Sequence, residues 1–178
     1  MNANDARMSE TANGLRTAFD RSFSQATTTD LAVIEQLLAV RVGSHKYLVR
    51  LAEVSGLFAD KRITWLPSPL PELLGLAGLR GTVFPVYDLG TLLGAARAVA
   101  PRWLLVTAAT PVGFAFDHFD GYLSVRPEDI VQELRAETRE RHVLEVVRAV
   151  DFIRPLISLA SVLESITKRA SGDSSQKE

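Results

Sequence analysis

The feature that most constrains the fold of this 178-residue chain is a succession of short β-rich runs separated by glycine and proline. The runs Leu37–Val42 and Lys46–Leu51 flank Gly43-Ser44-His45, which predicts a β-hairpin. Thr82–Tyr87 is dense in β-branched and aromatic residues, and Pro85 places it at a sheet edge or a bulge because proline lacks an N–H donor. Further short strands are predicted at Arg102–Thr107, Val112–Asp117, Gly121–Val125 and Val143–Val150. The chain is therefore predicted to be mainly β, built from one small barrel or a pair of them.

Helices are predicted at fewer places. Pro71 suits the first position of a helix, so Glu72–Leu76 is predicted to form a single helical turn. Glu128–Arg141 is predicted to be an exposed helix or loop because it contains an i,i+4 pair of opposite charges. Later in the chain, Ser158 or Ser161 is expected to cap a longer helix. The apolar face of that helix carries Leu159, Val162, Leu163 and Ile166.

The two ends of the chain differ from its middle in composition. Residues 1–30 are rich in Ser, Thr, Asn and Ala and are predicted to be a flexible extension, residues 31–168 to form the domain, and residues 169–178 to be a flexible tail. Three apolar residues of the extension recur every four positions and would share one face of a short helix. These residues are Leu15, Phe19 and Phe23. That face would either rest on the protein's own body or dock a partner.

Composition excludes several classes of protein. Hydrophobic residues make up 47% of the chain and charged residues 23%, which is the balance of a globular protein. Twenty basic and 21 acidic residues give a net charge of -1, which argues against a nucleic-acid ligand. Cysteine is absent, so thiol catalysis and cysteine-held metal centres are excluded. No apolar run approaches the ~20 residues of a membrane span, and Met1–Arg16 lacks the apolar segment of a signal peptide.

The histidines and their neighbours do not predict catalysis. His45, His118 and His142 are far apart in the sequence and belong to no zinc-protease motif. The densest group of potential metal ligands is Asp117-His118-Phe119-Asp120. Two carboxylates and one imidazole do not establish a metal site, so Asp117 and Asp120 are predicted to close a turn through Asx hydrogen bonds. A metal protein or enzyme using this cluster is the competing hypothesis.

Three glycines, Gly75, Gly78 and Gly81, are spaced by threes. Phosphate-binding glycine loops lead into a helix, whereas these glycines lead into a β-rich run. We therefore interpret them as turn residues that allow close backbone approach. The sequence predicts no catalytic residue, no cofactor and no metal, and recognition of other proteins is the simpler interpretation.

The segment from Gly78 to Leu89 resembles the central motif of the CheW family of chemotaxis coupling proteins. It reads Gly-Leu-Arg-Gly-Thr-Val-Phe-Pro-Val-Tyr-Asp-Leu, where the family reads Asn-Leu-Arg-Gly-x-(apolar)-x-Pro-(apolar)-(apolar)-Asp-Leu. Other family elements follow in the same order: the opening hairpin, Ala52-Glu53-Val54, the proline-rich link, the apolar strand Val112–Asp117, and the last strand and helix in Ile153–Leu163. The resemblance covers Leu37 to Ile166. The sequence departs from the family at Gly78, where Asn is usual, at Gly90, where Arg is frequent, and at His118, where Gly is frequent.

The resemblance implies a fold of two SH3-like five-stranded β-barrels that share a hydrophobic interface. It also implies a non-catalytic, cytoplasmic protein of two-component chemotaxis signalling. Such a protein would bridge the cytoplasmic tip of methyl-accepting chemoreceptors and the regulatory domain of a CheA-type histidine kinase, which pairs with it barrel to barrel in membrane-associated arrays. A protein that binds one partner alone and uncouples the kinase is the alternative function. Neither nucleic acid nor direct membrane insertion is expected.

The resemblance also assigns partner binding to Val54, Gly75, Arg80 and Gly81, and it places Val54, Gly75 and Arg80 near one surface. Each has a structural alternative: Val54 as a buried strand residue, Gly75 as a turn glycine, and Arg80 as the ion-pair partner of Asp88. The predicted core comprises Leu38, Val40, Val49, Leu51, Val83, Val86, Leu105, Phe114, Phe116 and Ile157.

Overall fold

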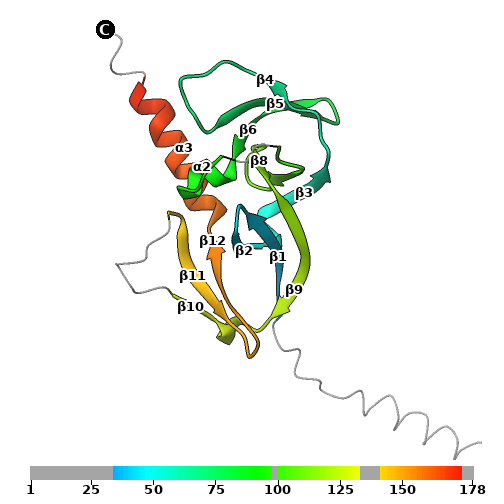
Figure 1. Cartoon of the computed structure of the whole chain (residues 1–178), viewed down its shortest axis with the longest axis vertical. Helices are drawn as coiled ribbons and strands as arrows, with labels where there is room; N and C mark the ends of the chain where they lie inside the picture. The colour runs from blue at the N-terminus through cyan, green and yellow to red at the C-terminus, as the bar shows by residue number, and fades with distance from the viewer. Residues whose placement is uncertain (1–33, 98–99, 133–140, 174–178) are drawn as a thin grey trace, which may run out of the picture. The chain divides into compact units, whose positions relative to one another are not determined.

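The structure, a computed structural model, describes residues 34–97, 100–132 and 141–173, with side chains up to Arg169. Its strands form two six-stranded sheets, drawn one below the other in Figure 1. The first sheet contains β1 (Glu35–Val42), β2 (His45–Arg50), β9 (His118–Val125), β10 (Ile130–Gln132), β11 (Val143–Arg148) and β12 (Ile153–Ile157). The second contains β3 (Val54–Ala59), β4 (Thr64–Trp65), β5 (Leu73–Leu79), β6 (Thr82–Asp88), β7 (Trp103–Thr107) and β8 (Gly113–Phe116). The helical elements are η1 (Leu51–Glu53), α2 (Leu89–Leu93), η2 (Pro127–Asp129) and α3 (Leu159–Asp173).

The mainly β architecture is confirmed, but each sheet has six strands rather than the five expected of each barrel. The strand orders are β10-β11-β12-β2-β1-β9 and β3-β7-β8-β6-β5-β4. All neighbouring strands in these orders are antiparallel except β12–β2 and β6–β8, which are parallel. The two shortest strands, β4 and β10, lie at sheet edges. Neither was predicted, because a run of two or three residues is too short to show the alternation of a strand.

The two sheets share their largest hydrophobic core. Leu38 and Val40 of the first sheet join Leu105, Phe114 and Phe116 of the second in one buried cluster, which α2 and α3 complete. Each sheet also has a smaller cluster of its own. The chain passes from one sheet to the other at η1 and between β8 and β9, so the shared core ties together segments that are distant in sequence.

Two segments for which a helix was considered contain strands in the structure. Glu72–Leu76 was expected to form a helical turn, yet β5 begins at Leu73 and pairs with β6 along its length. In the predicted helix or loop Glu128–Arg141, η2 is followed by β10, whose β-branched residues pair with β11. In both cases pairing with the next strand along the chain outweighs the weak local preference. Residues 133–140 lie outside the described part of the chain.

The core prediction is correct except at Val83 and Leu51. Val83 is 66% exposed. Side chains alternate along a strand, and in β6 it is Phe84 and Val86 that face the hydrophobic core. Val83 and Val86 therefore cannot share a face of this strand. Leu51 is half-buried in η1 and packs against the shared core from its edge.

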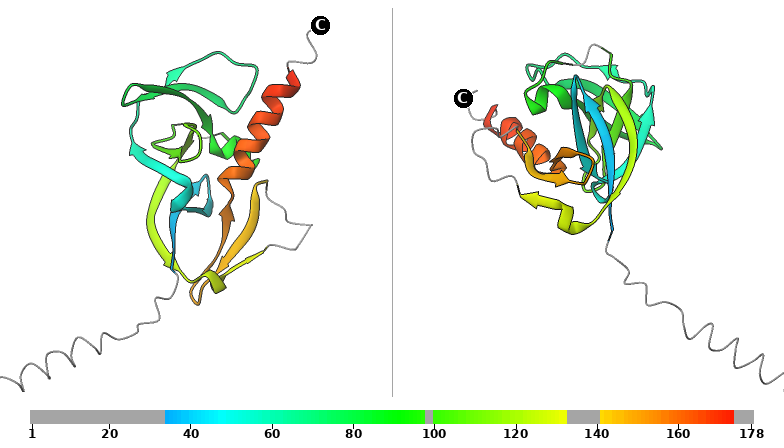
Figure 2. Two further views of the ribbon diagram at one scale, coloured as in Figure 1. Left: turned by 180° about the vertical axis from the view of Figure 1, so that it is seen from behind. Right: turned by 60° about the horizontal axis from the view of Figure 1, so that its bottom comes forward.

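Helix α3 begins as predicted and extends further than predicted. The Oγ atom of Ser158 accepts a hydrogen bond of 3.2 Å from the N–H of Ser161, so Ser158 is the cap. The helix continues beyond Lys168 to Asp173, and Figures 1 and 2 show it running from β12 along the side of the second sheet. The predicted extension, residues 1–30, and its apolar residues lie outside the described residues.

Candidate partner-binding surfaces

Arg80 and Gly81 form the two-residue turn of the β5–β6 hairpin. Leu79 pairs with Thr82, and the φ angles of Arg80 and Gly81 are 49° and 84°. Positive φ at both central residues is the geometry of a type I′ turn, which suits the right-handed twist of a hairpin. Glycine adopts it freely, whereas arginine does so at a cost. The turn displays the exposed Arg80 side chain at the end of the hairpin.

The structural alternative for Arg80, an ion pair with Asp88, is not found in the structure. Asp88 is buried, and its Oδ1 atom accepts hydrogen bonds of 2.7 Å from the N–H and from the hydroxyl of Thr91. It is the N-cap of α2. Within the described residues Arg80 makes no ion pair, so its guanidinium is available to a partner.

Gly75 is a structural requirement of the second sheet. It is buried in β5 beside β4, with a φ of +149°. A Cβ atom at this position would lie 2.0 Å from the carbonyl oxygen of Thr64. Gly75 therefore allows β4 to approach β5 closely. Its effect on a partner surface is indirect, because it sets the position of β4.

Val54 lies apart from the other three predicted site residues. It begins β3, which is one edge of the second sheet, and it pairs with Thr107 of β7. Gly75, Arg80 and Gly81 belong to the β5–β6 hairpin, which lies towards the opposite edge, next to β4. The structure brings these three residues to one hairpin and separates Val54 from them by β7 and β8.

Val54 instead borders a groove beside α3. The groove has a volume of about 580 Å³. We call it the α3 groove; it is lined by Ala52, Glu53, Thr107, Ala108, Ala109, Leu159, Ala160, Leu163 and Glu164. Val54 follows Glu53 directly and pairs with Thr107, so it is adjacent to two lining residues. Small apolar side chains make most of this lining, with Glu53 and Glu164 as its charged members.

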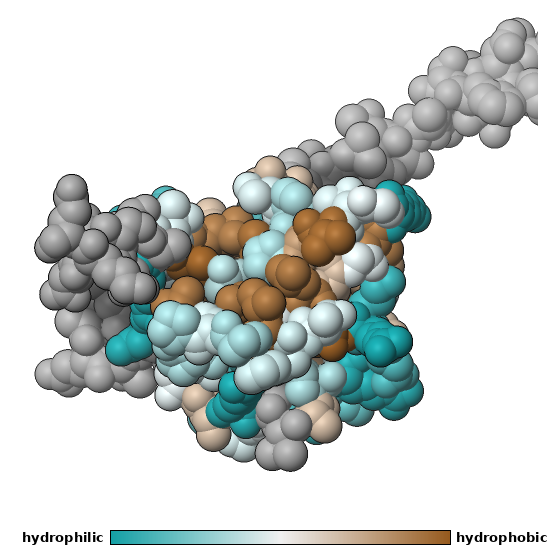
Figure 3. All heavy atoms as spheres, turned by 90° about the horizontal axis from the view of Figure 1, so that it is seen from above, coloured by the Kyte–Doolittle hydropathy of each residue, from teal (hydrophilic) through white to brown (hydrophobic). Residues whose placement is uncertain are grey.

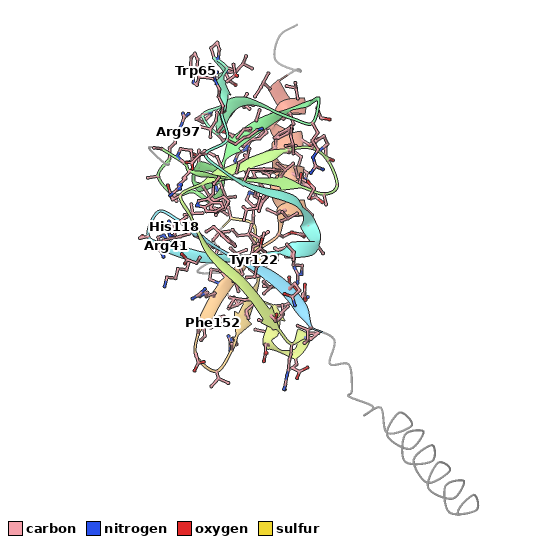
Figure 4. All side chains as sticks on the ribbon, turned by 90° about the vertical axis from the view of Figure 1, so that its right-hand side faces the viewer. Arg41, Trp65, Arg97, His118, Tyr122 and Phe152 are labelled. Carbon is pink, nitrogen blue, oxygen red and sulfur yellow. The ribbon has the colours of Figure 1, made fainter. Side chains whose placement is uncertain are left out.

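A second surface is formed by exposed side chains of β4, the β5–β6 hairpin and the residues next to them. Trp65 is 68% exposed and Leu66 41%. Together with the exposed Arg62 and Arg80, they make up what we call the β4–β6 surface. Figure 3, which views this end of the molecule, shows apolar residues in the middle and hydrophilic ones around them. Figure 4 shows Trp65 projecting from the end of the molecule.

The sign of the charge on the β4–β6 surface is positive. Between residues 61 and 87, all of which the structure describes, Glu72 is the single acidic residue, and it is 2% exposed. Tryptophan and arginine are the residues most enriched at the energetic centres of interfaces. Sequence reasoning missed Trp65. Its only signal is a tryptophan beside the proline-rich link, and this does not reveal that its two-residue strand lies at a sheet edge.

The Asp117–Asp120 cluster forms contacts with β1 and its turn. The N–H of Gly43 donates to Oδ2 of Asp117 over 2.6 Å, and Arg41 pairs with Asp120 over 2.8 Å. The two carboxylates thus bind a neighbouring strand and turn, and the prediction of a local Asx turn was wrong. No group of three His, Cys, Asp or Glu side chains suited to a metal ion is found in the parts of the chain that the structure describes.

The sequence pattern of the CheW-like domain matches residues 36–167, most of the chain. The chain belongs to the CheW-like domain family. Among solved structures, the scaffolding protein TtCheW from Thermoanaerobacter tengcongensis is similar, with a TM-score of 0.63 and 17% identity over 70% of this chain and 88% of that one. No curated protein matches the chain.

Membership of the CheW-like family confirms the resemblance deduced from the central motif. The family consists of non-catalytic scaffolding domains that serve as adaptors in chemotaxis signalling and bind kinase and receptors. The likeness to TtCheW is one of fold. The family pattern covers strands of both sheets and the first part of α3. None of the helices in the described residues is long and apolar enough to cross a membrane.

Proposed function

We propose that this CheW-like protein couples the cytoplasmic tip of a chemoreceptor to the regulatory domain of a CheA-type histidine kinase. The observation that carries the proposal is the presence of two chemically different surfaces on the second sheet. The α3 groove lies beside the η1–β3 edge, and the β4–β6 surface lies at the opposite edge. An adaptor that holds two partners at once needs two such surfaces.

The α3 groove suits a helical partner. Alanine and leucine side chains make up most of its lining, and recognition of an amphipathic helix in an apolar groove is a common mode of binding. We therefore assign the groove, with Val54 at its border, to the chemoreceptor tip. Its acidic residue Glu164 is exposed at the rim, which favours a basic residue on the partner helix.

The β4–β6 surface suits a globular partner with acidic side chains. Trp65 supplies a large exposed ring, and Arg62 and Arg80 supply planar guanidinium groups that bind carboxylates. We assign this surface to the kinase regulatory domain. Gly75 and Gly81 act there through the backbone, because they set the position of β4 and the form of the turn. Contact with receptors would recruit the protein from the cytoplasm to membrane-associated arrays.

The same fold supports a second function, a competitor that binds one partner alone. Gly78 favours it, because this exposed position beside the Arg80 turn lacks the asparagine side chain usual in the family. A weakened kinase surface with an intact α3 groove would occupy receptors without recruiting the kinase.

Reconstitution of receptor, kinase and the full chain separates the two functions. A coupler raises kinase activity as it is titrated in, up to the point where partners are saturated, whereas a competitor only lowers the activity supported by another coupling protein. Co-purification at micromolar concentration supplies the direct measurement of binding. The proposal would be contradicted if the protein formed no complex with the chemoreceptor tip and none with the kinase regulatory domain.

A further inference from the structure

Helix α3 follows the last strand of the first sheet, but it makes two polar contacts with residues that directly precede strands of the second sheet, Glu53 before β3 and Glu72 before β5. At its start, the N–H of Leu159 donates to Oε2 of Glu53 over 3.1 Å. Ten residues later, Nη1 of Arg169 donates to Oε1 of Glu72 over 2.7 Å. At ~1.5 Å per residue these attachments are roughly 15 Å apart along the helix. The orientation of α3 is therefore fixed by two separate polar contacts.

Arg169 lies on the same face of α3 as the residues that are buried in the shared core. Leu159, Val162 and Ile166 recur at helical spacing and are buried in the shared core. Arg169 follows at the same spacing and meets Glu72, which is 2% exposed, while its own side chain is 42% exposed. A carboxylate buried to this degree requires a charged partner or water. Loss of the guanidinium would therefore require water to reach Glu72, which a shift of this end of α3 would allow.

The adjacent stripe of α3 is a wall of the α3 groove. Ala160, Leu163 and Glu164 line the groove, one helical step away from the buried stripe. The opposite wall, Thr107–Ala109, belongs to the second sheet and the loop that follows β7. A change in the tilt of α3 against the second sheet would alter the distance between these walls.

We infer that the ion pair between Glu72 and Arg169 sets the position of α3 as a wall of the α3 groove, so that Arg169 is a positioning residue for the groove's partner. This inference rests on the proposed function in assigning a partner helix to the groove. Neither residue lines the groove, so their effect on binding would be indirect. A contact that only stabilised the fold would leave the affinity of the folded protein unchanged.

The test compares Arg169→Gln with Lys168→Gln, which removes the same charge from an exposed neighbour on the helix. The chain has no cysteine, so spin labels can be attached at Thr167→Cys on α3 and Ala59→Cys on β3, both exposed. Double electron–electron resonance should show a broader and shifted distribution of distances between the two labels in Arg169→Gln, and an unchanged distribution in Lys168→Gln. Affinity for a chemoreceptor tip fragment should fall about tenfold in Arg169→Gln and recover in part in Arg169→Lys.

Two results would overturn the inference about Arg169. A folded Arg169→Gln protein with an unchanged label distance overturns the inference, and so does a changed distance with unchanged affinity. If Arg169→Gln does not fold, the pair Glu72→Gln with Arg169→Gln removes the buried charge as well, and the same readouts apply to it. A wild-type protein that binds no receptor tip refutes the proposed function, and the label distances then still decide whether the ion pair positions α3.

Discussion

At the scale of single residues, Arg80 combines backbone strain with an unpaired charge. Its φ of 49° is a conformation that costs a non-glycine residue roughly 1–2 kcal/mol, and the guanidinium gains no ion pair within the described residues in return. Strained residues of this kind gather at binding sites, where the surrounding structure holds them in place. The strain at Arg80 is thus consistent with a role in partner binding and is hard to explain by stability.

Substitution of Arg80 should therefore separate stability from binding. Asparagine tolerates positive φ, so Arg80→Asn should unfold at an equal or higher temperature while affinity for the kinase domain falls by about 2 kcal/mol, roughly thirtyfold. Arg80→Ala should lose the same affinity without gain in stability. Calorimetry and titration of the kinase domain measure the two effects. If a stably folded Arg80→Asn protein bound the kinase domain with wild-type affinity, Arg80 would not contribute to partner binding.

His142 makes stability depend on pH near neutrality. Burial lowers the pKa of His142 below its ordinary 6.5, and the positive charges of Arg169 and Arg141 lower it further. Its Nδ1 atom lies 3.0 Å from the hydroxyl of Ser161, on the first turns of α3. Because the unfolded chain binds this proton more readily, stability is greatest above pH 6.5, falls as the pH drops below it, and levels off under the folded pKa.

Urea unfolding between about pH 5 and 8 measures this dependence. The free energy of unfolding of the wild type should decrease towards the acid end, and His142→Asn should lose that part of the decrease. Asparagine suits the position because the φ of His142 is 68°. His118→Asn, an exposed histidine, is the matched control and should keep the wild-type slope. Equal slopes in His142→Asn and the wild type would contradict the assignment.

At the scale of elements, the short strand β4 depends on one glycine. β4 has two residues, Thr64 and Trp65, and it pairs with Leu76 and Gly75. A strand this short cannot persist alone, so it is held by the close approach that Gly75 permits. The position of Trp65 on the β4–β6 surface is a consequence of this pairing.

We expect Gly75→Ala to destabilise the protein by about 3 kcal/mol, since the new Cβ would collide with a backbone oxygen and the φ is unfavourable. Gly78→Ala is the control on the same strand, because a Cβ there meets open space. Chemical denaturation compares the two variants, and proteolysis of the β4 segment reports its release. Equal stability of Gly75→Ala and Gly78→Ala would show that β4 does not need this contact.

At the scale of the whole molecule, the two proposed surfaces should be separable. Ala160→Glu places a charge in the α3 groove at an exposed position in the first turn of α3, where a carboxylate is favourable. It should weaken receptor binding tenfold or more and leave kinase binding intact, and Trp65→Ala should do the reverse. Pull-down of ternary complexes should succeed with the wild type and fail with either variant. Loss of both partners in a single folded variant would indicate one shared surface.

Much of the fold could be predicted from local sequence. Patterns a few residues long predict the hairpin of β1 and β2, the strands β6 to β8, a serine cap for α3 at Ser158 or Ser161, and most of the core. The central motif also identified the family, because Arg80, Gly81 and Pro85 recur there at fixed spacing. The errors arose where such patterns are weak: two short edge strands, one predicted helical turn, and Val83, whose face of β6 depends on register.

The sequence by itself determined the fold class, the family and the position of the glycine-containing turns, because these properties depend on residue type and on neighbours along the chain. Only the tertiary structure decided where the α3 groove lies, which tryptophan is exposed and why Glu72 is buried. The ion pair of Glu72 with Arg169 joins residues 97 positions apart, and the groove walls come from η1, β7 and α3. No local periodicity encodes such contacts, since they arise when two sheets pack on a common core and bring distant segments together.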